Sequence, residues 1–154
     1  MSLYQEQALK GASPIDLVVA LYDGMIRFLH GAADAVDRGD INARRAQVKR
    51  ALDILVHLQA RLRMDVGGQP ALVLSEFYAS IFAQILQASR AASRSKFEHT
   101  IGCVRNVRDA WKQVAREFNE TGIFQEGSFP PRPRSAPDQL QAGPTTSEVG
   151  HWTA

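Results

Sequence analysis

The chain has 154 residues, of which 45% are hydrophobic and 22% charged, and its formal net charge is +2. This length suits one ordinary domain, the charge is too small to indicate a nucleic-acid binder, and no run reaches the roughly 18 apolar residues of a membrane-spanning helix. Cys103 is the single cysteine and cannot form an internal disulfide. Since the N-terminus also lacks the basic-then-apolar layout of a secretory signal, we expect a cytosolic chain without membrane insertion.

The first helix is predicted to begin after Ser13. In "SPID", Ser13 can act as the N-cap, Pro14 fits the first turn, and Asp16 completes a capping-box spacing. Gly39 in "RGD" is expected to end this helix, and the aspartate that follows it caps the next one.

An Asp-Gly pair lies in the middle of this first helix, in "VVALYDGMIRFL". Such a pair is a hairpin signal, but an apolar stripe continues through it at steps of three and four residues. We therefore predict a helix interior, in which Gly24 makes room for a neighbouring helix, the favoured interpretation, or for a bound partner. Tyr22 is expected to anchor this helix in the core, with its hydroxyl reaching toward a polar group at the bundle edge.

Three further helices are predicted at about 41–65, about 71–92, and from Ser95 to Phe118. Ser95 has Glu98 three residues on, which is again a capping-box spacing. Connections of only a few residues favour antiparallel neighbours, and no segment has a convincing strand pattern. The predicted fold is all-α, an antiparallel up-down four-helix bundle. The third helix is expected to turn these residues inward: Leu74, Tyr78, Ile81, Phe82 and Ile85.

The composition changes near residue 118. Residues 119–154 contain five of the seven prolines and four of the eleven glycines, which is at the edge of the range typical of disordered sequences. We therefore predict three parts: an N-terminal arm at 1–12, the bundle at 13–118, and a disordered Pro/Gly-rich tail at 119–154.

The sequence carries no recognisable catalytic or metal-binding pattern. The predicted helices contain no Glu-x-x-His motif, whereas a di-iron site needs one from each of two helices, and no two histidines are four residues apart as in zinc motifs. Cys103 has no evident neighbouring base and is interpreted as a packing residue. We expect neither an enzyme nor a cofactor or metal site.

Apolar residues flank the main helical stripes and widen them beyond what one bundle face requires. They have two interpretations of about equal weight: broad contacts within a bundle or dimer, or surface grooves that accept apolar side chains of a partner helix. These candidate partner-binding residues are Leu17, Val19, Ile26, Phe28, Ile54, Val56, Leu72 and Phe77.

The fourth helix also carries four basic residues within one narrow arc. The preferred interpretation is a solvated face. Docking of an acidic partner is the second option and nucleic-acid binding the third, although interleaved aromatic residues are lacking. This possible docking ridge consists of Arg105, Arg108, Lys112 and Arg116.

From Tyr4 to Trp111 the chain resembles the flagellar secretion chaperones of the FliS family. The resemblance rests on Tyr4 and on a set of motifs that together are fairly specific. These are "GASPIDLVVALYDGMIRFL" at 11–29, "ALDIL" at 51–55, "MDVGGQPALVLSEFYASIFAQILQAS" at 64–89 and "VRDAW" at 107–111.

The resemblance implies a helical bundle that binds the disordered C-terminal segment of flagellin in the cytosol. Such chaperones prevent premature polymerisation and help to deliver flagellin to the export gate. The family's N-terminal arm covers part of the apolar surface, a role that would fall here to Tyr4 and Leu3. A monomer or weak homodimer that binds no nucleic acid is expected. The alternatives are a homodimeric structural or regulatory bundle without a client and, less favoured, a nucleic-acid adaptor.

Overall fold

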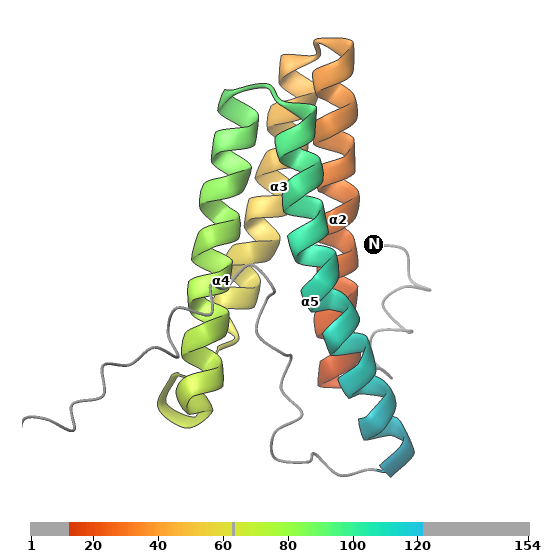
Figure 1. Cartoon of the computed structure of the whole chain (residues 1–154), viewed down its shortest axis with the longest axis vertical. Helices are drawn as coiled ribbons and strands as arrows, with labels where there is room; N and C mark the ends of the chain where they lie inside the picture. The colour runs from red at the N-terminus through yellow and green to blue at the C-terminus, as the bar shows by residue number, and fades with distance from the viewer. Residues whose placement is uncertain (1–12, 63, 122–154) are drawn as a thin grey trace, which may run out of the picture.

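Four long helices make up the part of the chain that the computed structural model describes, residues 13–62 and 64–121 (Figure 1). They are α2 (Pro14–Arg38), α3 (Ile41–Ala60), α4 (Met64–Arg90) and α5 (Arg94–Thr121). Successive helices run in opposite directions, and the described range contains no strand. The predicted all-α, up-down four-helix bundle is confirmed. The predicted arm lies outside the described residues, and so does the predicted tail except for 119–121, which belong to the end of α5.

The four helices do not contact one another equally. α2 packs extensively against both α3 and α5, whereas α4 makes less contact with its two neighbours, α3 and α5. In Figure 1, α4 stands at the edge of the bundle opposite α2. A helix that contacts its neighbours less leaves more of its surface uncovered, and this decides where the candidate site lies.

The ends of α2 follow the sequence signals. The Ser13 hydroxyl accepts a hydrogen bond from the Asp16 amide at 3.1 Å, and the Asp16 carboxylate accepts one from the Ser13 amide at 3.3 Å. Gly39 closes the helix in the left-handed conformation, with φ of 65°. Asp40 then caps α3 by accepting from the Ala43 amide at 2.9 Å. Each of these groups lies within four residues of its partner, so local sequence suffices to predict them.

Two of the other predicted boundaries differ from the structure by several residues. α3 ends at Ala60, where the amides of Arg61 and Leu62 each bond to a carbonyl three residues back and tighten the last turn. α4 begins at Met64, but Gly68 interrupts it with φ of 54°. The regular part of α4 therefore follows Gly68, close to the predicted start.

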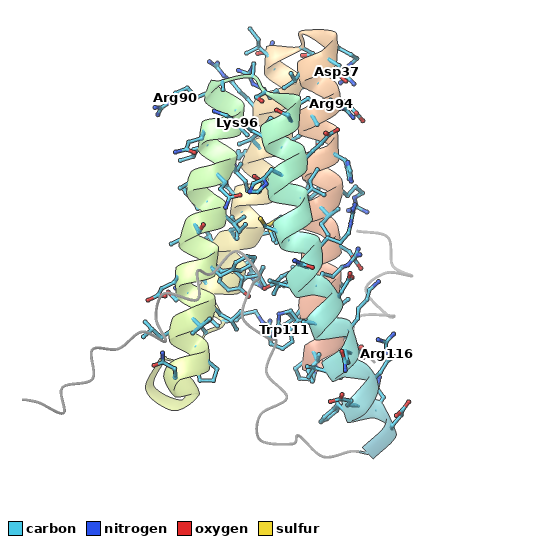
Figure 2. All side chains as sticks on the ribbon, in the orientation of Figure 1. Asp37, Arg90, Arg94, Lys96, Trp111 and Arg116 are labelled. Atoms are coloured by element: carbon cyan, nitrogen blue, oxygen red, sulfur yellow. The ribbon has the colours of Figure 1, made fainter. Side chains whose placement is uncertain are left out.

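The N-cap of α5 is Ser93, which corrects the prediction of Ser95. The Ser93 hydroxyl accepts from the Lys96 amide at 3.2 Å. The Glu98 carboxylate accepts instead from the Arg94 guanidinium at 3.0 Å. Arg94 also pairs with Asp34 on α2 and with Asp37, which lies beside it in Figure 2, so this side chain ties the start of α5 to the end of α2.

Gly39, at the end of α2, and Gly102, inside α5, have different backbone conformations and give a matched pair of substitutions. Gly39→Ala is expected to lower the free energy of unfolding by about 1 kcal/mol, because its φ of 65° disfavours a Cβ. Gly102→Ala is expected to raise it by about 0.5–1 kcal/mol, since Gly102 is exposed inside α5 and an added Cβ would meet nothing within 4 Å. Urea unfolding measures both values, and equal signs would contradict the assignment of these two positions.

Gly24 is a helix-interior residue that faces a neighbouring helix, as favoured from the sequence. An added Cβ would lie 3.2 Å from the Cδ1 atom of Ile54 on α3. The absence of a side chain thus lets α2 and α3 approach closely. The hairpin signal in "LYDG" is overridden by this packing and by the continuous stripe.

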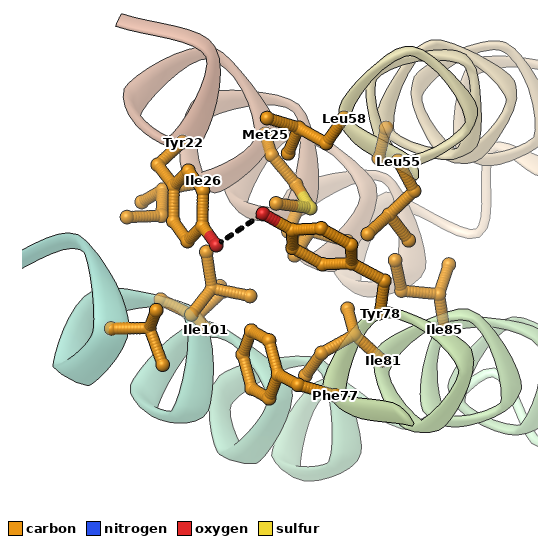
Figure 3. Close-up of a cluster of buried hydrophobic side chains, with 14 of the residues drawn as sticks. Tyr22, Met25, Ile26, Leu55, Leu58, Phe77, Tyr78, Ile81, Ile85 and Ile101 are labelled. Carbon is orange, nitrogen blue, oxygen red and sulfur yellow. Dashed lines mark hydrogen bonds between the residues drawn. The ribbon is translucent and has the colours of Figure 1, made fainter. Parts of the chain in front are cut away.

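The core contains a hydrogen-bonded pair of tyrosines (Figure 3). The Tyr22 hydroxyl donates to the Tyr78 hydroxyl at 2.8 Å, and both side chains are buried. The polar partner of Tyr22 thus lies inside the core and not at the bundle edge, which corrects the prediction. Burial raises the pKa of Tyr78 to about 12. Burial and the neighbouring Tyr78 raise the pKa of Tyr22 well above its usual value. The uncharged forms are therefore the ones that the fold stabilises.

Candidate functional site

An open apolar groove of about 520 Å³ lies between α3 and α4. Its floor is made by Leu55 and Tyr78, which belong to the core, and its rim by Val56 and Phe82, which are 60% and 37% exposed. The volume is in the range of sites that bury a compact apolar ligand. The complete lining is Leu55, Val56, Gln59, Ala60, Ser75, Tyr78, Ala79 and Phe82.

The α4 wall of the groove belongs to a longer exposed stripe. This stripe advances by three or four residues at each step, which keeps its members on one side of the helix. Small side chains at Ser75 and Ala79 separate larger apolar ones, and this alternation leaves the hollow. A hydrogen bond of 2.8 Å from Gln59 to Ser75 joins α3 to α4 across the groove. The stripe consists of Leu72, Ser75, Ala79, Phe82 and Leu86.

Charge is distributed unevenly around the groove. Between Gly68 and Arg90 the sequence of α4 has one acid, Glu76, and its next charge is Arg90 itself, one turn beyond Leu86. On α3, Arg45 and Lys49 precede Val56 by three and two helical turns and so lie on its side of the helix. Because α3 and α4 are antiparallel, these three cations lie beyond the same end of the groove, toward the end of α4 at which Figure 2 labels Arg90. We call this end the basic end of the groove.

The segment Gly68–Arg90 also has the length and apolar composition of a membrane span. Its inward residues nevertheless pack in the bundle core, including Leu74, Ile81 and Ile85. Its outward apolar residues line the groove. A core helix with one uncovered apolar face accounts for this composition.

The structure separates the predicted partner-binding residues into three groups. Val56 lines the groove, and Leu72 lies exposed on the same α4 stripe. Ile26 and Phe77 are only 6% and 7% exposed and belong to the core, so their predicted availability to a partner was wrong. Their apolar surface serves the bundle, which was the alternative interpretation.

The remaining predicted residues lie between these extremes or outside the described range. Val19, Phe28 and Ile54 are half-buried and pack against the core, while Leu17 is half-buried. The Phe28 ring faces the guanidinium groups of its neighbours Arg27 and Arg50, at 5.4 and 5.7 Å from the ring centre. Leu3 and Tyr4 lie outside the described residues, so their role stays a prediction.

The predicted basic ridge on α5 is interrupted by an ion pair. Arg108 donates to the Asp23 carboxylate on α2 at 2.9 Å and also pairs with Asp109. It is therefore a tie between helices, and only its neighbours Arg105, Lys112 and Arg116 are exposed. This leaves three exposed cations on the ridge, which weakens the case for nucleic-acid docking there.

Cys103 has a neighbour that the sequence interpretation missed. Its sulfur lies 3.8 Å from Nε2 of His99, one helical turn before it. Burial raises the pKa of the Cys103 thiol, which disfavours the thiolate that a nucleophile needs. Among the residues described by the structure, no group of three or more His, Cys, Asp or Glu side chains could hold a metal ion.

Comparison with known proteins identifies the family. The family model described as "Flagellar protein FliS" matches residues 1–117. The chain belongs to the FliS family of flagellar secretion chaperones. It is 32% identical to the flagellar secretion chaperone FliS of Salmonella typhimurium over 122 residues, covering 79% of this chain and 87% of the relative. It is 30% identical to the FliS of Vibrio cholerae, covering 79% and 90%, and 26% identical to that of Bacillus subtilis, covering 72% and 82%.

All the groove residues lie within the part of the chain that matches the FliS model. Sequence reasoning found Val56 and Leu72 but missed Ala79 and Leu86, and it assigned Phe82 to the core, where it does not lie. A signal for them was present. The stripe from Leu72 to Leu86 is regular, and almost no charge interrupts α4, so a second apolar face could have been recognised.

Proposed function

We propose that this FliS-family chain is a cytosolic export chaperone that binds the disordered C-terminal segment of flagellin in the α3–α4 groove. The observation that carries the proposal is an uncovered apolar groove, rimmed by Val56 and Phe82, in a member of a flagellar secretion chaperone family. An exposed apolar patch of this kind is typical of a protein-binding surface. Holding the segment would prevent premature polymerisation until flagellin reaches the export gate.

The chemistry of the groove suits a helix or extended segment with apolar anchors. Side chains of the client would cover the rim residues and fill the hollow over Ser75 and Ala79. Each Å² of apolar surface removed from water contributes about 25 cal/mol. Ordering a disordered segment costs several kcal/mol of this gain. The resulting moderate affinity is compatible with release at the export gate.

Binding in this proposal requires no bond making or breaking, so we propose a non-enzymatic role. The N-terminal arm, with Leu3 and Tyr4, would cover part of the apolar surface when no client is present. Only the fraction of molecules with the arm open could bind client, which lowers the apparent affinity.

Titration of the full chain with a peptide of the flagellin C-terminal segment tests the proposal. We expect a 1:1 complex by light scattering and calorimetry, with a negative heat-capacity change from apolar burial. A stable dimer that ignores flagellin would support the homodimeric structural bundle. Salt-dependent binding of DNA or RNA, weakened by Lys112→Glu, would support the nucleic-acid adaptor.

A further inference from the structure

The sequence beyond α5 has a chemistry that complements the groove. Residues 135–154 contain no lysine or arginine, and their two acids, Asp138 and Glu148, lie close to apolar residues. Asp138 is two residues from Leu140, and Glu148 is next to Val149 and four residues from Trp152. This part of the chain follows residue 117, where the FliS family match ends.

The groove offers the reciprocal pattern. Its lining is apolar, with an exposed rim at Val56 and Phe82, and its basic end carries Arg45, Lys49 and Arg90. Lys49 forms an ion pair with Asp53 at 2.9 Å, but both side chains are highly exposed. The pair therefore contributes little to stability, and another carboxylate can replace Asp53 as the partner of Lys49. An occupant with apolar anchors and nearby carboxylates fits such a surface better than a basic or purely polar one.

The chain is long enough to bring this segment to the groove. Residues 122–137 can span at most roughly 55 Å, whereas the 28 residues of α5 extend only about 42 Å. A segment tethered in this way competes at an effective concentration on the order of millimolar. Even a weak intrinsic affinity therefore produces substantial occupancy.

We propose that residues 135–154 dock in the α3–α4 groove of their own chain and compete there with the client. Trp152, Val149 and Leu140 supply the apolar anchors, and Asp138 and Glu148 lie toward the basic end. The competition rests on the proposed function, whereas the docking does not. The segment lowers the apparent affinity for the client and keeps the groove covered when no client is bound.

Amide NMR of the full chain tests the docking without flagellin. Trp152→Ala is expected to shift the amide resonances of groove residues such as Val56, Ala79 and Phe82, while Trp152→Phe retains most of the wild-type shifts. Thr145→Ala, a conservative change in the same segment, serves as the matched control. The charge reversals Asp138→Lys and Glu148→Lys should shift the same resonances. Raising the salt concentration should shift the wild-type resonances in the same direction, because salt screens the attraction between these carboxylates and the basic end.

The absence of groove shifts in Trp152→Ala would overturn the docking, whether or not flagellin binds. Shifts that depend on protein concentration would also overturn it, because they would place the segment on a second copy of the chain. In the client titration, Trp152→Ala should bind the flagellin peptide about 3- to 10-fold more tightly than wild type. Groove shifts without any flagellin binding would leave the docking intact and reject the proposed function. If Trp152→Ala shifts the groove resonances but binds the flagellin peptide with wild-type affinity, the segment docks in the groove without competing with the client.

Discussion

Replacing Val56 by Asp is expected to weaken binding of the flagellin segment by more than about 100-fold while the bundle remains folded. Val56 is 60% exposed on the surface of the bundle, so a carboxylate there is hydrated and costs the fold little. In the complex the same carboxylate would be buried against apolar client side chains without a partner. An uncompensated buried charge costs about 3 kcal/mol or more, which corresponds to that loss of affinity.

A neighbouring substitution provides the control for this prediction. His57 is exposed on α3 but does not line the groove, so His57→Asp adds the same group outside the proposed contact. We expect it to change the dissociation constant less than about 2-fold. Calorimetry gives the affinities, and circular dichroism with thermal unfolding checks the fold. Wild-type affinity in Val56→Asp would show that the client binds elsewhere.

The tyrosine pair predicts a steep loss of stability at alkaline pH. Burial raises the pKa of Tyr78 to about 12 and that of Tyr22 well above 10, whereas both titrate near 10 in the unfolded chain. The unfolded state therefore loses protons first. The contribution of Tyr78 is fully present below pH 10 and is lost as pH rises from 10 to about 12. Tyr78 accounts for about 2–3 kcal/mol of this loss.

Removing one hydroxyl separates this effect from the titration of exposed lysines. Tyr78→Phe eliminates one titrating group, so its free energy of unfolding should fall less steeply between pH 10 and 12 than that of wild type. At neutral pH the variant should be less stable by about 1–3 kcal/mol, because the Tyr22 hydroxyl loses its 2.8 Å partner. Urea unfolding at each pH gives these values. Equal slopes would mean that the buried pair does not control alkaline stability.

The exposure of individual side chains was the part of the candidate site that sequence reasoning predicted least well. Phe82 was assigned to the core and lies at the groove rim, whereas Ile26 and Phe77 were assigned to a partner surface and are buried. A helical wheel gives the direction of each side chain from its own helix axis. It does not give the number or position of the helices around that axis. α2 has close neighbours on two sides and buries its wide arc, while α4 has less contact and exposes part of its own.

The Tyr22 hydroxyl illustrates the same limit. The sequence predicts that a buried tyrosine needs a polar partner, and the structure supplies Tyr78, which lies 56 residues later in the chain. Cys103 and His99 are the opposite case. They are one helical turn apart, so their proximity could have been recognised from spacing alone.

The sequence by itself determined the helical class, the caps of α2 and the family resemblance, because these depend on apolar periodicity and on groups within about four residues of one another. It also supported the helical interpretation of Gly24, since the stripe continued through it. Only the tertiary structure decided that Gly24 faces Ile54 and that Val56 and Phe82 line the same groove. Those contacts join separate helices, and they depend on which faces remain uncovered once the bundle has packed.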